Sequence, residues 1–279
     1  MNIVQTYTDS FESATMTDKE KYNLIKESET IFIPSGFNFL KEIKGIRPGK
    51  ITSLLAPSGV GKSTLARSIA IEAAKNGIVY YWLTEEKKEE FKLGLAKANI
   101  SNSILNNIKI FSEIDCNIPI NIDPSIFINQ MESKLKLMNP ILIICDNLTT
   151  SSIYMDRFDI QGEVVGLIGK LVSNLDCGFL TVLHTKSEIT DNHRGLICIE
   201  DVRGKKIISI KSDYFYVMQV FKTDYTQHVT IRLDKHRHTS GVRNKLFLLD
   251  YSRDKNMYVS DRIINFAKFK ELFDQRNIL

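Results

Sequence analysis

The chain is built around a short segment that reads Leu54-Leu55-Ala56-Pro57-Ser58-Gly59-Val60-Gly61-Lys62-Ser63-Thr64. An apolar run at 51–55 enters this segment, and a helix-forming run at 65–75 leaves it. A strand, a loop of small residues and a helix in this order are the setting that a phosphate-binding P-loop requires. The segment therefore predicts a nucleotide site, although a plain glycine-rich turn is the alternative.

The chemistry of a P-loop explains these residue types. Backbone N–H groups curl around the β-phosphate, and the positive end of the following helix points at it. Lys62 can reach the β- and γ-phosphates and take part in catalysis, and the Ser63 hydroxyl can ligate Mg²⁺. In the usual pattern, G-x-x-x-x-G-K-[ST], Ala56 stands at the first glycine position. We expect ATP with Mg²⁺ to bind at Ala56, Pro57, Ser58, Gly59, Val60, Gly61, Lys62, Ser63 and Thr64.

Composition indicates a globular protein. Of 279 residues, 43% are hydrophobic and 25% are charged, which allows a sizeable core. The net charge of +4 permits nucleic-acid binding without requiring it. We expect no membrane segment and no signal peptide, because no apolar run approaches the ~20 residues of a span. The four cysteines are far apart in the sequence, so we expect them to be reduced thiols in a cytoplasmic protein. They are Cys116, Cys145, Cys177 and Cys198.

Two parts are predicted along the chain, a polar segment at 1–30 and a core domain at 31–279. Residues 1–13 are polar, and we expect them to be disordered or ordered only on a partner. Thr17 and Glu20 have the spacing of a capping box, which predicts a helix to about Glu27. This helix could pack on its own domain or link to a neighbouring subunit.

The core alternates strands with helices, which predicts an α/β fold with a mainly parallel sheet covered on both faces. Strands are predicted at 51–55, 78–83, 108–111, 141–146 and 178–183, and helices at 65–75, 87–98, 124–137 and 160–175. The last third predicts an antiparallel addition and a closing helix. Its strands are expected at 214–220, 229–233 and 245–251, and its helix at 261–273.

Polar residues end several of the predicted parallel strands, and these ends meet at one edge of such a sheet. Asp146 follows four aliphatic residues and a cysteine, which is the Walker-B arrangement, and it can hold Mg²⁺ beside Ser63. The alternative is that Asp146 caps the following turn.

Glu85, Glu86 and His184 also follow strands. A carboxylate here can activate the water that attacks the γ-phosphate, and we expect Glu85 to do so and Glu86 to start the next helix. Both could instead be ordinary helix-start acids. His184 could sense the γ-phosphate or be structural.

A basic stretch, 235–241, lies between two of the late strands. It can be a solvated hairpin turn. Alternatively, Lys235 and Arg237 offer cations to the phosphates of a neighbouring subunit, as an arginine finger does.

The order of these motifs resembles that of RecA-like ATPases. The residues that carry the resemblance are Pro34 to Phe37, Gly45 to Gly49, the P-loop, Tyr81 to Glu86, Ile143 to Asn147 and Leu183 to Lys186. More narrowly, 32–258 is similar to the ATPase domains of the DnaB and RepA replicative-helicase group, in which Ala56 and the Lys235-x-Arg237 pair have counterparts. RadA- and KaiC-type proteins share the two adjacent glutamates. DnaB proteins carry a primase-binding N-terminal domain, whereas only 1–30 precede the core here.

The resemblance implies a hexameric ring with ATP between subunits and single-stranded DNA passing through central loops. Basic groups in the loops after Asp146 and His184 would neutralise DNA phosphates. The candidates are Lys186, Arg194, Arg203, Lys205 and Lys206, although a solvated loop would carry the same residues. The predicted function is an ATP-driven DNA helicase of phage, plasmid or bacterial replication, with replication proteins as partners. The alternatives are a RadA-like recombination ATPase and a KaiC-like regulatory switch.

Overall fold

The computed structural model describes residues 16–29, 32–33, 36–189, 196–204, 206–222, 227–237 and 245–264. Contacts divide the chain into two units, Met1–Ile31 and Phe32–Leu279. The first contains α2 (Asp18–Glu29), and residues 1–13 lie outside the description. The predicted capping box is confirmed, because the N–H of Glu20 donates to the Thr17 hydroxyl at 3.2 Å and the N–H of Thr17 donates to the Glu20 carboxylate at 2.7 Å.

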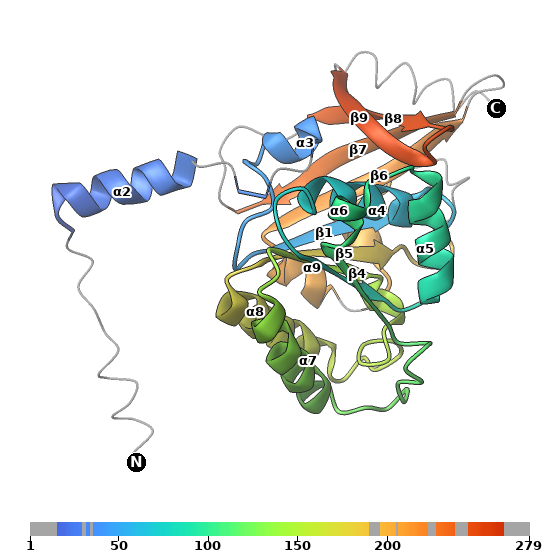
Figure 1. Cartoon of the computed structure of the whole chain (residues 1–279), viewed down its shortest axis with the longest axis horizontal. Helices are drawn as coiled ribbons and strands as arrows, with labels where there is room; N and C mark the ends of the chain where they lie inside the picture. The colour runs from blue at the N-terminus through green and yellow to red at the C-terminus, as the bar shows by residue number, and fades with distance from the viewer. Residues whose placement is uncertain are drawn as a thin grey trace. The chain divides into compact units, whose positions relative to one another are not determined.

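The second unit is organised on one sheet, which in its described residues has nine strands in the order β3-β2-β4-β5-β1-β6-β7-β8-β9 (Figure 1). The strands are β1 (Ile51–Ala56), β2 (Val79–Leu83), β3 (Ile108–Ser112), β4 (Leu142–Asp146), β5 (Gly178–His184), β6 (Tyr214–Lys222), β7 (Gln227–His236), β8 (Leu246–Ser252) and β9 (Met257–Ile264). The first six run parallel to their neighbours, and β7, β8 and β9 continue antiparallel from β6. The predicted fold class is confirmed.

Helices cover both faces of this sheet (Figure 1). They are α3 (Asn38–Lys41), α4 (Lys62–Ala73), α5 (Lys88–Lys97), α6 (Asn102–Leu105), α7 (Pro124–Met138), α8 (Gln161–Leu175) and α9 (Ile207–Lys211), with 3₁₀ turns η1 (Leu148–Thr150) and η2 (Ile199–Asp201). No described helix combines the length and apolarity needed to cross a bilayer.

Alternation along the buried strands divides the core in two, because successive strand side chains point to opposite faces. On β2, Tyr81 and Leu83 pack in one cluster with α4 and α5, whereas Tyr80 and Trp82 pack in the other with α7 and α8. Both faces of the central strands are therefore apolar, as expected for a doubly covered parallel sheet. The four cysteines are free, and Cys145 and Cys177 are buried in the core.

The strand register brings the predicted polar strand ends to one edge. Ala56 at the end of β1 pairs with His184 at the end of β5, and Leu83 at the end of β2 pairs with Asp146 at the end of β4. Because β4 also pairs with β5, four carboxyl ends lie in a row.

The predicted helix at 261–273 is wrong where it can be compared. Residues 257–264 form β9, and 265–273 lie outside the described part. Pairing with β8 from Ile264 to Met257 imposes the extended conformation. The Asp261 carboxylate then accepts hydrogen bonds from the N–H groups of Asn38 and Phe39, at 2.6 and 2.9 Å, and so caps the first turn of α3.

We expect Asp261→Ala to lower the free energy of unfolding by about 1–3 kcal/mol, because it leaves two N–H groups near the core without their acceptor. Chemical denaturation measures this change. Asp254→Ala is the control, since Asp254 is exposed in the turn between β8 and β9. Equal effects of the two substitutions would contradict the capping role.

Candidate active site

The P-loop joins the end of β1 to the start of α4, which begins at Lys62. Gly59 and Gly61 have φ values of 81° and 94°, the left-handed region that favours glycine. The N–H groups of the first turn of α4 lack acceptors within the helix, so they are available to an anion at the loop. Lys62 is buried, and its Nζ donates to the Pro57 carbonyl at 3.0 Å.

Tyr258 of β9 closes the loop from the side of the antiparallel strands. Its hydroxyl donates to the Val60 carbonyl at 3.3 Å. A Cβ at Gly61 would come within 2.8 Å of that hydroxyl, so glycine is required there for space as well as for φ. No local pattern indicates this contact, because it joins residues 198 positions apart in the chain.

Asp146 and Ser63 meet as the Walker-B interpretation predicts. The Ser63 hydroxyl donates to Asp146 Oδ1 at 3.1 Å, and the Tyr81 hydroxyl donates to Oδ2 at 2.9 Å. Burial raises the pKa of Asp146, and these two hydrogen bonds oppose that rise. Burial lowers the pKa of Lys62, against the attraction of Asp146 and Glu85. Tyr81, which the sequence analysis missed, positions the carboxylate.

The donor set fits Mg²⁺. A serine hydroxyl and a carboxylate side by side are hard oxygen ligands, and a phosphate and waters complete the coordination in sites of this kind. The described residues contain no group of three or more histidine, cysteine or acidic side chains that could hold a metal alone. A cation here would therefore depend on ligands beyond these side chains.

Glu85 and His184 form a pair at the same edge. His184 Nε2 lies 3.2 Å from Glu85 Oε1, and Asn147 Nδ2 donates to Glu85 Oε2 at 2.8 Å. The hydrogen bond with His184 is the main influence that lowers the pKa of Glu85; Asn147 and Lys62 act in the same direction, and burial opposes them. Asn147, which directly follows Asp146, was not among the predicted site residues.

Glu86 lies apart from this pair. Its carboxylate forms an ion pair with Arg67 at 3.4 Å, and the Arg67 guanidinium lies 5.1 Å from the ring centroid of Phe91. Burial raises the pKa of Glu86, and Arg67 opposes the rise. The two adjacent glutamates therefore have different partners, and the role of Glu85 stays a prediction.

Two cavities flank the P-loop. One of about 620 Å³ is lined by Gly59, Gly61 and Thr64 at the loop, by Tyr251 of β8 and by Arg253, which follows β8. The other, of about 450 Å³, lies on the opposite flank and is lined by Ser58, Glu85, His184, Ile189, Thr185, Lys186, Ser187 and Arg203.

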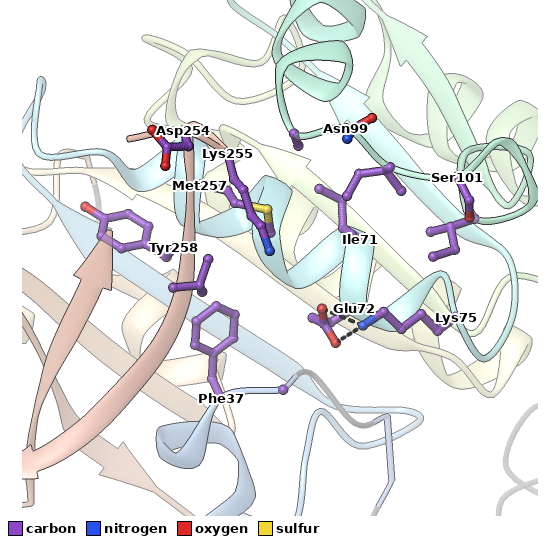
Figure 2. A pocket seen from close by; sticks show the side chains of 15 residues that line it. Phe37, Ile71, Glu72, Lys75, Asn99, Ser101, Asp254, Lys255, Met257 and Tyr258 are labelled. Atoms are coloured by element: carbon purple, nitrogen blue, oxygen red, sulfur yellow. Dashed lines mark hydrogen bonds and ion pairs between the residues drawn. The ribbon is translucent and has the colours of Figure 1, made fainter. Parts of the chain in front are cut away.

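A third cavity, of about 660 Å³, lies beyond the C-terminal half of α4 (Figure 2). Phe37, Ile71 and Met257 contribute apolar walls, and an ion pair between Lys75 and Glu72 at 2.7 Å lies at its side (Figure 2). Tyr258 lines this cavity as well as the 620 Å³ one, so the two cavities adjoin at this residue.

The predicted basic groups fall into three sets. Lys186 and Arg203 are exposed and line the same cavity as the Glu85–His184 pair, and the N–H of Arg203 donates to the His184 carbonyl at 2.9 Å. Lys206 is exposed and precedes α9. Arg194 and Lys205 lie outside the described residues.

Lys235 and Arg237 lie near the amino ends of the parallel strands, whereas the chain's own P-loop lies at their carboxyl ends. Lys235 pairs with Phe215 near the start of β6, and the start of β6 is aligned with the start of β1. Lys235 Nζ donates to the carbonyls of Ser209 and Ile210, each at 2.6 Å, and Arg237 donates to the Ile210 carbonyl. Burial, and then Arg237, lower the pKa of Lys235. Neither cation can join this chain's own site.

A glycine-rich loop between the end of β1 and the start of α4, at one edge of a largely parallel sheet, defines a P-loop fold of the RecA-like class. No family model and no curated protein matches the sequence. Among solved structures, a DnaB-like replicative helicase, described with its interactions with primase, matches with a TM-score of 0.69 at 16% identity over 92% of this chain and 70% of that chain. A KaiC-like protein from the hyperthermophilic archaeon Pyrococcus horikoshii matches with a TM-score of 0.64 at 13% identity, over 84% of this chain and 99% of that chain. The RecA-like resemblance is thus confirmed for the fold.

We expect His184→Ala to raise the pKa of Glu85, because it removes the hydrogen bond that contributes most to lowering that pKa. Carbon-detected NMR titration of the glutamate carboxyl groups measures the change. Since the pKa is lowered in the folded state, the stability that this contact adds is present above the unfolded pKa and is lost as pH falls through the folded pKa.

Glu86→Gln is the matched control, because it removes the adjacent carboxylate and leaves the contact between His184 and Glu85 in place. An unchanged Glu85 titration in His184→Ala would show that the pair does not govern this carboxylate.

Proposed function

We propose that this chain is a Mg²⁺-dependent ATPase that assembles as a hexameric ring and moves on single-stranded DNA as a replicative helicase. The observation that carries the proposal is the 450 Å³ cavity. It brings Glu85 and His184, the candidate hydrolytic groups, together with Lys186 and Arg203, the candidate DNA-binding groups. Hydrolysis and DNA binding then share one set of strand ends.

The phosphates of ATP are bound by the P-loop amides and Lys62, whose burial strengthens its interaction with an anion. Ser63 and Asp146 hold the cation, and Tyr81 keeps the carboxylate oriented. When bound, Mg²⁺ neutralises charge that develops on the phosphates.

Glu85 is the general base. Its lowered pKa keeps the carboxylate ionised at neutral pH, ready to accept a proton from water. The water oxygen bonds to the γ-phosphorus, the bond from that phosphorus to the β,γ-bridging oxygen breaks, and ADP and phosphate leave. His184 and Asn147 hold Glu85 in place for this step.

The 620 Å³ cavity accommodates the nucleoside. It continues from Gly59 and Gly61 past Tyr251 and Arg253, and Tyr251 is partly exposed. An aromatic ring and a guanidinium group are the side chains on which a purine base stacks well. The triphosphate then lies along the loop and the base lies towards β8.

Lys235 and Arg237 act on the site of a neighbouring subunit. Their place at the edge remote from the chain's own P-loop supports action in trans, as in an arginine finger. Two cations at one subunit boundary would make turnover depend on assembly.

DNA is bound through backbone phosphates. Lys186, Arg203 and Lys206 are exposed cations that follow β5, so binding would be independent of sequence and sensitive to salt. Replication proteins are the expected partners, and the segment at 1–30 is proposed as an arm that links subunits.

A KaiC-like switch that binds ATP and acts on a protein partner is the second candidate, supported by the likeness that covers 99% of a KaiC-like chain. A RadA-like recombination filament is the third candidate. Closed rings or open helices in electron micrographs distinguish the helicase from the filament.

We expect single-stranded DNA to stimulate ATP turnover by about tenfold or more, in a sample that mass photometry shows to be hexameric, because DNA-binding and hydrolytic groups share one cavity. Turnover without and with DNA is the measurement. Lys62→Ala, which removes the cation that binds the phosphates, should abolish turnover and serves as the control for contaminating ATPases. ATP binding with no DNA stimulation would favour the regulatory switch.

We expect Arg237→Ala to bind ATP as the unaltered protein does but to lose turnover by about 10³-fold, the size of an arginine-finger effect. A fluorescent ATP analogue measures binding and phosphate release measures turnover. Lys211→Ala, at the end of the neighbouring α9, is a matched loss of one basic group. Undiminished turnover in Arg237→Ala, or in monomers, would contradict the proposal that Arg237 acts on the site of a neighbouring subunit.

A further inference from the structure

Glu113 is a buried carboxylate directly after β3 that the proposed mechanism does not use. Its relative exposure is 4%. The indole N–H of Trp82 and the hydroxyl of Ser151 both donate to Oε1 at 2.7 Å, and the N–H of Ser152 donates to Oε2 at 2.8 Å. Both oxygens of the carboxylate are therefore hydrogen-bonded, as a buried polar group requires.

The three donors belong to elements that also carry the candidate catalytic groups. Trp82 is on β2, whose end leads into Glu85. Ser151 and Ser152 follow η1, the turn that begins directly after Asp146 and Asn147. Glu113 therefore ties β2 and β3 to the segment 147–152.

The same segment contacts the Glu85–His184 pair at its other end. The Thr149 hydroxyl accepts the N–H of His184 at 3.2 Å and donates to Asn147 Oδ1 at 2.6 Å. Asn147 Nδ2 in turn donates to Glu85 Oε2 at 2.8 Å. Because 147–152 is short, fixing Ser151 and Ser152 limits the positions that Asn147 and Thr149 can take.

A second connection strengthens this arrangement. The Thr84 hydroxyl accepts the N–H of Asn147 at 2.8 Å and is hydrogen-bonded to the Thr150 hydroxyl, also at 2.8 Å. Thr84 immediately precedes Glu85. The segment 147–152 is thus held by Thr84 at Asn147 and Thr150 and by Glu113 at Ser151 and Ser152, and its Asn147 contacts Glu85.

We propose that Glu113 is a positioning residue: it fixes the segment 147–152 so that Asn147 and Thr149 hold Glu85 and His184 in the geometry for hydrolysis. The role rests on the proposed ATPase function. Glu113 contacts no reacting atom; it acts through Ser151 and Ser152. Trp82, the single tryptophan of the chain, shares the same carboxylate and so reports on it by fluorescence.

The test is Glu113→Gln, which keeps the volume of the side chain, removes its charge and turns an N–H group towards Ser152 or Trp82. Three measurements are made on the full chain: backbone hydrogen exchange over 147–155, binding of a fluorescent ATP analogue, and ATP turnover. The expected results are faster exchange over 147–155, analogue affinity within about twofold, and turnover lower by about tenfold or more, as a small misplacement of catalytic groups produces.

Glu132→Gln is the matched control. It also removes a hydrogen-bonded glutamate, but Glu132 lies on α7 and pairs with Lys136 and Asn174. It should change neither exchange over 147–155 nor turnover, and the emission of Trp82 should change in Glu113→Gln alone. Ser151→Ala, which removes one donor and keeps the acid, should give the same pattern to a smaller degree if Glu113→Gln fails to fold.

Unchanged exchange over 147–155 would overturn the proposal, because the acid would then not fix the segment. Faster exchange with unaltered turnover would also overturn it, since the fixed segment would not matter for hydrolysis. If the unaltered protein binds the analogue but does not hydrolyse ATP, the ATPase proposal fails. In that case the exchange measurement still decides whether Glu113 fixes the segment, and the positioning role in hydrolysis falls with the ATPase.

Discussion

The parallel pairing of β1, β5, β4 and β2 is the constraint on which the rest of this structure depends. It aligns the ends of four strands so that the P-loop, His184, Asp146 and Glu85 lie along one edge. These strands are buried on both faces, and the apolar clusters on either side fix their register. A shift of one residue would exchange the two faces of a strand, so the packing of the core and the geometry of the site are set together.

Asp146 and Asn147 at this edge are buried, and each is hydrogen-bonded by residues that are distant in the chain. Asp146 accepts from Ser63 and Tyr81, and Asn147 is bonded to Thr84. Such a network makes the site rigid before a ligand binds, because a buried polar group without its partner costs about 1–3 kcal/mol. Rigidity of this kind suits the proposed hydrolysis, in which a carboxylate and a water are held in line with a phosphate.

The antiparallel strands contribute residues beside the P-loop and also carry basic residues that lie far from it. Tyr258 of β9 supports the P-loop through Val60, and the cavity beside it continues to Tyr251. At the remote end of β7, Lys235 and Arg237 lie beyond reach of the chain's own loop. One addition to the sheet therefore supports the chain's own P-loop and, in the proposed ring, carries the cations that would act on a neighbouring subunit.

The sequence by itself determined the P-loop, the polar residues that end the parallel strands, and the sheet covered on both faces. These features depend on local spacing and on apolar runs, which are visible without knowledge of tertiary contacts. The sequence also predicted that Glu85 and Glu86 have different roles, and the two carboxylates do have different partners. Only the tertiary structure decided that 257–264 form a strand, since β9 is held by pairing with β8 and by the contact of Asp261 with the distant α3. Tyr258 and Glu113 were hidden for the same reason: their roles lie in contacts with residues far along the chain, and no local pattern carries that information.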